Sequence, residues 1–378
     1  MNSPRRWLIL VFLVALCFGA LPCRAQTWKL ATFENREYVP LNDVADFYEL
    51  RLLTGGPAGS IQLVSPGRSL RGSISSKEFY VQGIKFILSF PLLAFGDAIY
   101  LSRNDLTKLV EPVLRPHRLR NLGAVRTIIL DPGHGGHDRG AVSPFGTESE
   151  FTLDVAYRVR DLLLKKRGYR IEMTRKDDTF ISLEDRTRIA NRFRDSGLFI
   201  SIHFNAGSGI GTGIETYLMA PRLVPSYNGD GAPTLAELQQ WQGNAHDPEN
   251  MALATAMHAA LLNRLPLDDR GIKRARFHVL RENQLPAVLV EGGFLSNADE
   301  ARRISFPAYR QAMAEAIVMA IDNFKIATAE AATPDAPPLA RSAPAAPAGP
   351  YSDEIETMMR QPPSPPGTGP KVSVPTSN

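Results

Sequence analysis

Short apolar runs and longer segments with helical apolar spacing alternate along the second half of the chain. The runs that predict strands are 127–130, 169–174, 198–202, 213–219, 276–280 and 287–290. Helices are expected where apolar residues recur every three or four positions, at 151–162, 182–193, 250–265 and 309–324. Strands separated by helices form a sheet that helices cover on both faces. We therefore expect residues 127–326 to form an α/β domain with a mostly parallel sheet.

Residues 26–118 have a different pattern, in which alternating polar and apolar positions predict short strands. Two such segments are 60–64 and 78–88, each bounded by Gly, Pro or Ser. Segment 37–44 is echoed at 99–106, and in each copy a short strand leads to an Asn-Asp pair that would cap a following helix. The pattern predicts a small β-rich domain.

This β-rich domain resembles the small domain found at the N-terminus of copper amine oxidases and in many exported bacterial proteins. It contains no cluster of His or Cys, so the resemblance brings no copper site with it. We interpret the domain as a spacer or wall-binding module, with a purely structural extension of the next domain as the alternative. Residues 119–126 are expected to link the two domains.

Both ends of the chain differ in composition from the parts expected to fold. Residues 1–25 carry two arginines before a 15-residue apolar run and end in a small residue, a pattern typical of a secretory signal peptide. An uncleaved anchor is the alternative, although a membrane span needs about 20 residues. Residues 327–378 are rich in Pro, Ala, Ser and Thr and cannot bury enough apolar surface to fold, which predicts a disordered tail.

Cleavage of the predicted signal changes the composition. Cys17 and Cys23 are the two cysteines of the chain, so the mature protein would have neither disulfides nor thiol chemistry. Three arginines are removed as well, which leaves 40 of the 43 basic residues against 39 acidic ones. This balance gives no reason to expect nucleic-acid binding. We expect an exported protein without a transmembrane segment in its mature form, with a periplasmic location favoured over full secretion.

Three strands of the α/β domain end in residues that are suited to catalysis. His134 follows the first strand in a turn rich in Pro and Gly, His203 ends the third strand, and Glu291 ends the last one. A carboxylate at the rim of a buried strand is costly unless it is paired or functional. Because ligands of open α/β sheets bind at the carboxyl ends of the strands, we expect these side chains to share one site.

Two histidines at one sheet edge favour a zinc site, which usually needs a third protein ligand and keeps one position open for water. Glu148 and Glu150 are the candidates, because both lie between the first strand and the first helix. Glu148 is favoured, since it lies at the entrance to the helix and can fold back toward His134. A carboxylate in the first turn often serves only the helix dipole. The residues alone leave both candidates open.

Four segments of this domain match a known set of motifs in order and spacing. They are 131–141 (Asp-Pro-Gly-His-Gly-Gly-His-Asp-Arg-Gly-Ala), 182–191 (Ser-Leu-Glu-Asp-Arg-Thr-Arg-Ile-Ala-Asn), 201–206 (Ser-Ile-His-Phe-Asn-Ala) and 286–297 (Pro-Ala-Val-Leu-Val-Glu-Gly-Gly-Phe-Leu-Ser-Asn). Together they resemble the zinc-dependent N-acetylmuramoyl-L-alanine amidases of the type-three, cell-separation family. The resemblance implies that His134, Glu148 and His203 bind one zinc ion and that Glu291 is the catalytic glutamate.

The resemblance also implies a reaction, which is hydrolysis of the amide between the lactyl group of N-acetylmuramic acid and the L-alanine of the stem peptide in peptidoglycan. Zinc would activate a water molecule and polarise the carbonyl, and Glu291 would pass the proton of the water to the departing amine. Two alternatives are a zinc peptidase that cuts within the stem peptide and a non-catalytic peptidoglycan-binding protein. The second would require a lost ligand or a lost Glu291, and all four residues are present.

A regulatory segment is a further hypothesis. Residues 221–247 interrupt the alternation of strands and helices, and some relatives carry an insertion at about this place that closes the site until a protein activator binds. We hypothesise that this segment closes the site with Glu237 near the zinc, against the alternative of a surface loop. Arg186 and Asn205 lie in the matching motifs, where either could bind substrate or hold the fold. His278, in the strand expected at 276–280, is a candidate substrate contact.

Overall fold

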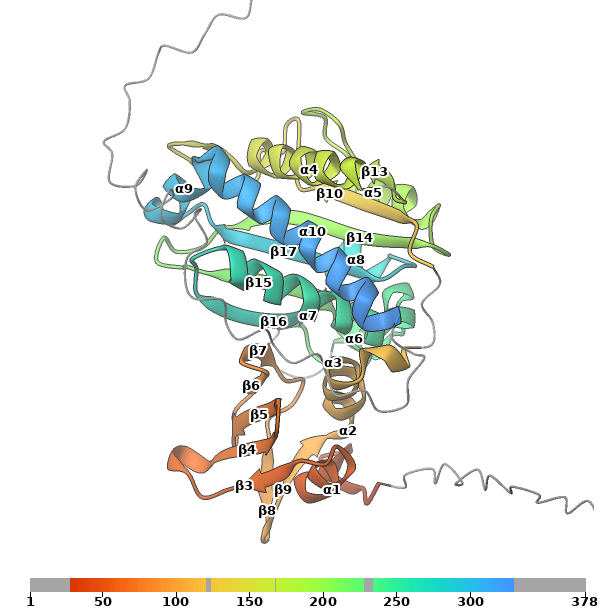
Figure 1. The fold of residues 1–378 in the computed structure, drawn as a ribbon, viewed down its shortest axis with the longest axis vertical. Coiled ribbons are helices and arrows are strands. Elements are labelled where there is room, and N and C mark those ends of the chain that lie inside the picture. The colour runs from red at the N-terminus through yellow and green to blue at the C-terminus, as the bar shows by residue number, and fades with distance from the viewer. Residues whose placement is uncertain (1–27, 120–123, 167, 228–233, 330–378) are drawn as a thin grey trace, which may run out of the picture.

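The computed structural model describes residues 28–119, 124–166, 168–227 and 234–329 (Figure 1). Its main feature is an 11-stranded sheet in the order β13-β10-β14-β17-β15-β16-β7-β6-β5-β4-β3. The strands from the second half of the chain are β10 (Thr127–Pro132), β13 (Arg170–Met173), β14 (Gly197–Asn205), β15 (Ile214–Met219), β16 (Asp269–Ala275) and β17 (Ala287–Phe294). A small hairpin of β11 (Val142–Ser143) and β12 (Gly146–Thr147) precedes the first helix of this half.

Helices cover both faces of this part of the sheet. One face carries α4 (Glu148–Lys165), α7 (Asp247–Arg264) and α10 (Pro307–Ala329), and the other carries α5 (Leu183–Asn191) and α8 (His278–Arg281) (Figure 1). Successive strand residues point to opposite faces. Ile128 and Leu130 of β10 therefore lie in the core beneath the three long helices, whereas Ile129 packs with residues of α5 and α8. The expected α/β class is confirmed. Shorter helices are α6 (Leu235–Leu238), η4 (Gln242–His246) and α9 (Ala298–Ser305).

The strand directions differ from the expectation of a mostly parallel sheet. Strands β13, β10, β14 and β17 are parallel to one another, but β15 pairs with β17 in the antiparallel direction. Strand β16 is parallel to β15, and β7 is parallel to β16, so the sheet is mixed. The reason lies between β14 and β15, where only the loop 206–213 connects the strands. A parallel connection takes a dozen or more residues, usually with a helix.

The N-terminal part contributes strands to two sheets. A four-stranded sheet consists, in spatial order, of β1 (Ala31–Phe33), β2 (Arg36–Pro40), β9 (Ala98–Ser102) and β8 (Leu93–Phe95). The large sheet takes β3 (Arg51–Leu53), β4 (Ser60–Ser65), β5 (Arg68–Ser73), β6 (Glu78–Val81) and β7 (Ile84–Ile87). The helical turns of this part are α1 (Leu41–Phe47), η1 (Pro57–Gly59), α2 (Arg103–Asp105), η2 (Leu106–Val110), α3 (Glu111–Leu114) and η3 (Pro116–Arg118).

The two helices expected after the Asn-Asp pairs both begin earlier than predicted. Helix α1 starts at Leu41 and α2 starts at Arg103, so each Asn-Asp pair lies inside a helical turn. At α2 the hydroxyl of Ser102 accepts the capping hydrogen bond from the backbone N–H of Asp105 at 3.0 Å. The capping residue therefore precedes the pair, because a serine hydroxyl serves this role as well as Asn or Asp does.

The sheet runs without a break from the N-terminal part into the second half of the chain, because β7 pairs with β16 at Phe86 and Ile272. A buried ion pair strengthens this junction, with Arg274 Nη1 and Asp105 Oδ1 at 2.7 Å. In Figure 1 the N-terminal strands lie below β16. The division of the chain into domains at 119–126 stays a prediction, and residues 120–123 of that segment lie outside the described residues.

Two further predictions can be compared with the structure. The strand expected at 276–280 is wrong: the strand is β16 at 269–275, and α8 begins at His278. The last helix continues to Ala329, slightly past the expected boundary at 326.

The predicted signal peptide at 1–25 and most of the predicted disordered tail lie outside the described residues. Among the residues that are described, none of the helices combines the length and apolarity of a membrane span.

Candidate active site

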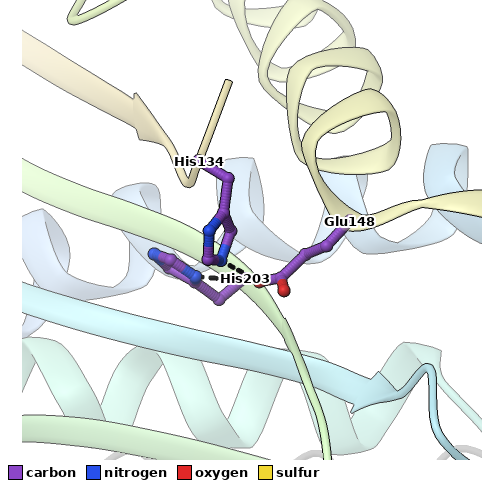
Figure 2. A group of neighbouring side chains, drawn as sticks. All are labelled: His134, Glu148 and His203. Carbon is purple, nitrogen blue, oxygen red and sulfur yellow. Dashed lines mark hydrogen bonds and ion pairs between the residues drawn. The ribbon is translucent and has the colours of Figure 1, made fainter. Parts of the chain in front are cut away.

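Two histidines and a glutamate come together at the carboxyl ends of β10 and β14. His134 follows β10, His203 belongs to the end of β14, and Glu148 is the first residue of α4 (Figure 2). One ligand atom from each of these side chains lies within 4.8 Å of the others. The structure thus brings together the three residues that the sequence assigned to a metal site.

The turn that carries His134 is strained locally and held firmly by its surroundings. His134 has φ of +62°, a left-handed conformation that is uncommon for a residue with a side chain. The buried Arg186 donates to the carbonyl oxygens of Pro132 and His134 at 2.7 and 2.6 Å. The buried Arg175 donates to those of Pro132 and Gly133 at 3.0 and 2.8 Å. Arg186 therefore holds this turn, and it also lines the cavity beside the histidines.

Gly133 allows the two histidines to approach each other. A Cβ atom at this position would lie 2.2 Å from Cε1 of His203, which is too close for any side chain. The glycine therefore lets the turn after β10 pass directly over the imidazole from the neighbouring strand. The imidazole rings of His134 and His203 lie edge to face, with 5.0 Å between their centroids.

Glu148 links both imidazoles through one oxygen. Its Oε1 lies 3.0 Å from Nε2 of His134 and 2.9 Å from Nδ1 of His203, and it also accepts from the backbone N–H of Phe204 at 3.1 Å. Its Oε2 accepts from the N–H of Ala141 at 2.9 Å. Burial raises the pKa of Glu148, but the hydrogen bonds and charges of the two histidines outweigh burial and lower it overall. The carboxylate is therefore ionised, as a metal ligand must be.

Glu150 points elsewhere. Its Oε2 accepts from the backbone N–H of Thr147 at 2.9 Å, while the hydroxyl of Thr147 accepts from the N–H of Glu150, so the two residues form a capping box at the start of α4. The structure therefore brings Glu148, and not Glu150, to the two histidines.

A second carboxylate, which was not expected from the sequence, orients His134. Asp138 Oδ2 lies 2.9 Å from Nδ1 of His134. This contact leaves Nε2 of the ring to face Glu148, and carboxylate partners of this kind commonly fix the orientation of metal-binding histidines. The available signal was the position of Asp138 in the same glycine-rich turn, four residues after His134.

Glu291 lies beside the histidines on the next strand. It is in register with His203 across β14 and β17 and with Glu215 across β17 and β15. Its Oε2 is buried and has no hydrogen-bond partner among the described residues. Burial raises the pKa of Glu291 well above its ordinary value, the charges of Glu148 and Glu215 raise it further, and Lys273 opposes them.

Glu215 is a second functional candidate that the sequence analysis did not find. Its Oε1 accepts from Lys273 Nζ at 2.5 Å and from Arg270 Nε at 2.6 Å. Its Oε2 accepts from the hydroxyl of Tyr217 at 2.7 Å and from Nδ2 of Asn205 at 2.9 Å. These partners come from β15, β16 and the end of β14, so no local pattern in the sequence could have predicted the network.

A cavity of about 550 Å³ opens onto these side chains. Its polar lining includes His134, Glu148, His203, Asn205 and Glu291. Its apolar lining includes Phe180, Ile181, Leu183, Phe277, Val279 and Leu289. The cavity lies on the face of the sheet that α5 and α8 cover.

Three further histidines of this half of the chain lie in different places. His278 lines the cavity from the start of α8, and His137 packs against Phe180 with 4.2 Å between ring centroids. His258 is fully buried in α7 between Thr216 and Asp269. None of the described residues of segment 221–247 lines the cavity.

Glu237 does not approach the histidines in this structure. Its carboxylate accepts from the backbone N–H groups of Thr234 and Ser226 at 2.8 and 3.2 Å, and it lies 3.7 Å from Arg276 Nη1. The hypothesis that Glu237 lies near the zinc is therefore wrong for the conformation described here.

The donor set fits a catalytic zinc ion. Two imidazole nitrogens and one carboxylate are the protein ligands of several zinc hydrolases, which keep a fourth position for water. Here three such donors converge at the wall of a cavity, and the buried, unpartnered Oε2 of Glu291 belongs to the same cavity. An acceptor without a partner at this place is what a water-activating base requires.

Comparisons with known proteins agree with this geometry. A family model described as N-acetylmuramoyl-L-alanine amidase matches residues 128–323. YqiI, an uncharacterized protein of Bacillus subtilis, is 33% identical over 199 residues, which cover 53% of this chain and 84% of that protein. The N-acetylmuramoyl-L-alanine amidase CwlM of Bacillus licheniformis is 36% identical over 188 residues, covering 50% of this chain and 64% of CwlM.

Among solved structures, the catalytic domain of the amidase CwlV from Bacillus (Paenibacillus) polymyxa var. colistinus aligns with a TM-score of 0.45 and 30% sequence identity. The alignment covers 54% of this chain and 99% of that domain.

Proposed function

The chain belongs to the N-acetylmuramoyl-L-alanine amidase family and cleaves the amide between N-acetylmuramic acid and L-alanine in peptidoglycan, and we propose that it does so with one zinc ion held by His134, Glu148 and His203. A zinc ion held by these residues would lower the pKa of a bound water to about 7 and would act as a Lewis acid toward the scissile carbonyl. The observation that carries the proposal is the convergence of these three donors in the cavity that also contains Glu291.

Glu291 is the proposed general base and then general acid. Its unpartnered Oε2 accepts a proton from the attacking water, whose oxygen forms a bond to the lactyl carbonyl carbon. The same oxygen atom then returns the proton to the nitrogen of L-alanine as the C–N bond breaks. The products are a carboxylic acid on the sugar and a free amine on the stem peptide. Burial raises the pKa of Glu291 above its ordinary value, which makes its carboxylate a stronger proton acceptor.

The surrounding residues hold the donors in place. Asp138 orients His134, and Arg175 and Arg186 fix the turn on which His134 lies. Because these groups are bonded before substrate arrives, little reorganisation is needed during the reaction. The apolar wall of the cavity, which includes Phe180 and Phe277, limits access of water to the reacting bond.

The test is release of free stem peptide from purified peptidoglycan by the purified protein, with and without a chelator. We expect peptides that begin with an L-alanine amine, loss of their release with chelator, and recovery when zinc is added back. Products cut within the stem peptide would instead identify a zinc peptidase. If the zinc-loaded protein binds peptidoglycan but releases no stem peptide from it, the chain is a non-catalytic binding protein.

Three proposals concern the rest of the protein. Export to a periplasm or to the medium fits a cell-wall substrate and the pattern of residues 1–25. The β-rich N-terminal part is proposed to serve as a wall-binding or spacer module. A protein activator remains a prediction, because the described residues of segment 221–247 leave the cavity open.

A further inference from the structure

The side chain of Asn205 lines the catalytic cavity, and both ends of its carboxamide are fixed. Oδ1 accepts from the backbone N–H of Ala206 at 2.8 Å, and Nδ2 donates to Oε2 of Glu215 at 2.9 Å. A backbone N–H can only donate and a carboxylate can only accept. The amide therefore has a single orientation, and one of its two Nδ2 hydrogens has no partner in these contacts.

Glu215 is well suited to hold that orientation. It is 2% exposed, and four donors occupy its two oxygens, including the buried Lys273 and the partly exposed Arg270. Burial raises the pKa of Glu215, but the hydrogen bonds from Arg270, Lys273 and Tyr217 lower it overall. Glu215 is therefore an anchored acceptor that cannot turn away from Asn205 without losing its ion pairs.

The backbone places this amide next to the reacting groups. Asn205 follows the metal-site residue His203 by two positions on β14, with a bulge between them. Glu215, its anchor, lies directly across from Glu291 in the β15–β17 pair. Asn205, His203 and Glu291 all line the same cavity. The amide of Asn205 is therefore a donor in the cavity that also contains the metal-site residues and Glu291.

We propose, on the basis of the function proposed above, that the free Nδ2 hydrogen of Asn205 donates to the oxygen of the scissile lactyl amide and that Glu215 is the positioning residue that aims it. The donor supplements the metal in stabilising the oxygen as its charge grows. Because the charge is larger in the transition state than in the substrate, the contribution belongs mainly to kcat.

The first test is Asn205→Ala in the purified protein, with soluble muramoyl-peptide as substrate. We expect kcat to fall about 10- to 100-fold with KM within about twofold of wild type, as for the loss of one donor to a developing charge. Zinc content measured by elemental analysis should stay at one per chain. A kcat within about twofold of wild type, or a change confined to KM, would overturn the assignment.

Asn191→Ala is the matched control. Asn191 also has both amide ends bonded, from Nδ2 to the carbonyl of Glu282 at 2.9 Å and to Oδ1 from the N–H of Gln284 at 2.8 Å, but it does not line the catalytic cavity. Its loss should leave kcat unchanged. If Asn191→Ala lowers kcat as much as Asn205→Ala does, the effect of Asn205 is structural and the proposal fails.

A double-mutant cycle tests the positioning role of Glu215. In Glu215→Gln the single carboxamide oxygen is drawn to Lys273 and Arg270, so the NH2 group faces Nδ2 of Asn205, a donor against a donor, and no longer holds the Asn205 amide in one orientation. We expect Glu215→Gln to lower kcat in the wild-type background and to add less than about twofold in the Asn205→Ala background. Effects that multiply would contradict the positioning role. Glu215→Asp keeps the charge and completes the cycle if Glu215→Gln does not fold.

The outcomes also separate this inference from the proposed function. If zinc-loaded wild type releases no free stem peptide, the proposed function fails. If wild type is active and Asn205→Ala equals it, only the role of Asn205 fails.

Discussion

Glu215 and Glu291 face each other across β15 and β17, yet their surroundings differ in almost every respect. Both oxygens of Glu215 receive hydrogen bonds, two of them from cationic side chains. Oε2 of Glu291 is buried and receives none from the described residues. The pKa of Glu215 is lowered, mainly because hydrogen bonds overcome the effect of burial, whereas burial and two nearby carboxylates raise the pKa of Glu291.

The difference shows that the hydrogen-bond donors around a buried carboxylate, rather than the residue type, decide what that carboxylate does. A carboxylate with every lone pair occupied supports structure, and removing it leaves buried cations unpaired. A carboxylate with an empty lone pair in a cavity is free to take a proton. Glu148, Asp131 and Glu150 extend the comparison, since each has a different set of partners.

The largest effect is expected at Glu148, whose Oε1 lies within hydrogen-bond distance of both imidazoles. We predict that Glu148→Ala loses zinc and that release of stem peptide falls at least about 1,000-fold, because a catalytic zinc site has only three protein ligands. Elemental analysis and a product assay measure the two effects together. A variant that keeps one zinc ion per chain would show that Glu148 is not a ligand.

Substitution of Glu215 should lower the stability of the fold rather than the binding of the metal. Glu215→Ala leaves the buried Lys273 without its carboxylate partner, so we predict a loss of about 3–5 kcal/mol in the free energy of unfolding, measured with denaturant. Glu34→Ala is the control, because it removes a surface ion pair with Arg36 and should cost less than about 1 kcal/mol. Equal losses in the two variants would refute the special status of Glu215.

Asp131 should make stability depend on pH. Burial raises its pKa, but the charge of Arg186 and hydrogen bonds from Thr174, Arg186 and Ser201 lower it below 3.8, the ordinary value. Since the pKa is lower in the folded chain, Asp131 contributes stability above about pH 4, and this contribution is lost as the pH falls through the folded value.

Urea unfolding between pH 7 and pH 3 would detect this loss. Asp131→Asn should be less stable than wild type at pH 7, and the gap between the two should narrow toward pH 3. A gap that stays constant over this range would mean that Asp131 does not titrate with folding.

The smallest effect is expected at Glu150. Its carboxylate caps α4 through Thr147, so Glu150→Ala should cost about 1 kcal/mol and leave zinc content and activity unchanged. Differential scanning calorimetry and elemental analysis can be run on the same sample. Loss of zinc from this variant would reverse the assignments of Glu148 and Glu150.

The sequence predicted the strands that end at the site, because these strands are buried on both faces and therefore appear as continuous apolar runs. It also indicated His134, His203 and Glu291, which interrupt those runs at their ends. The family resemblance, confirmed by the match over residues 128–323, selected Glu148.

Two of the misses, strand β16 and Glu215, share one physical cause, which is that charged residues can be buried when distant partners neutralise them. Strand β16 was not predicted because it is rich in charge, yet Lys273 and Arg274 are both buried in ion pairs with Glu215 and Asp105. Hydrophobic periodicity cannot detect such a strand. The antiparallel direction of β15 was missed for a different reason, because it depends on the short connection after β14 and not on the strand itself.

The most direct test of the central comparison is Glu291→Gln, which keeps the size of the side chain and removes its ability to take a proton. We predict that the variant binds one zinc ion per chain and has an unchanged free energy of unfolding. Its release of stem peptide should be lowered about 100- to 10,000-fold, as expected for the loss of a general base. Zinc content and peptide release should be measured on the same preparation. Activity close to that of wild type with a full complement of zinc would contradict the role of Glu291.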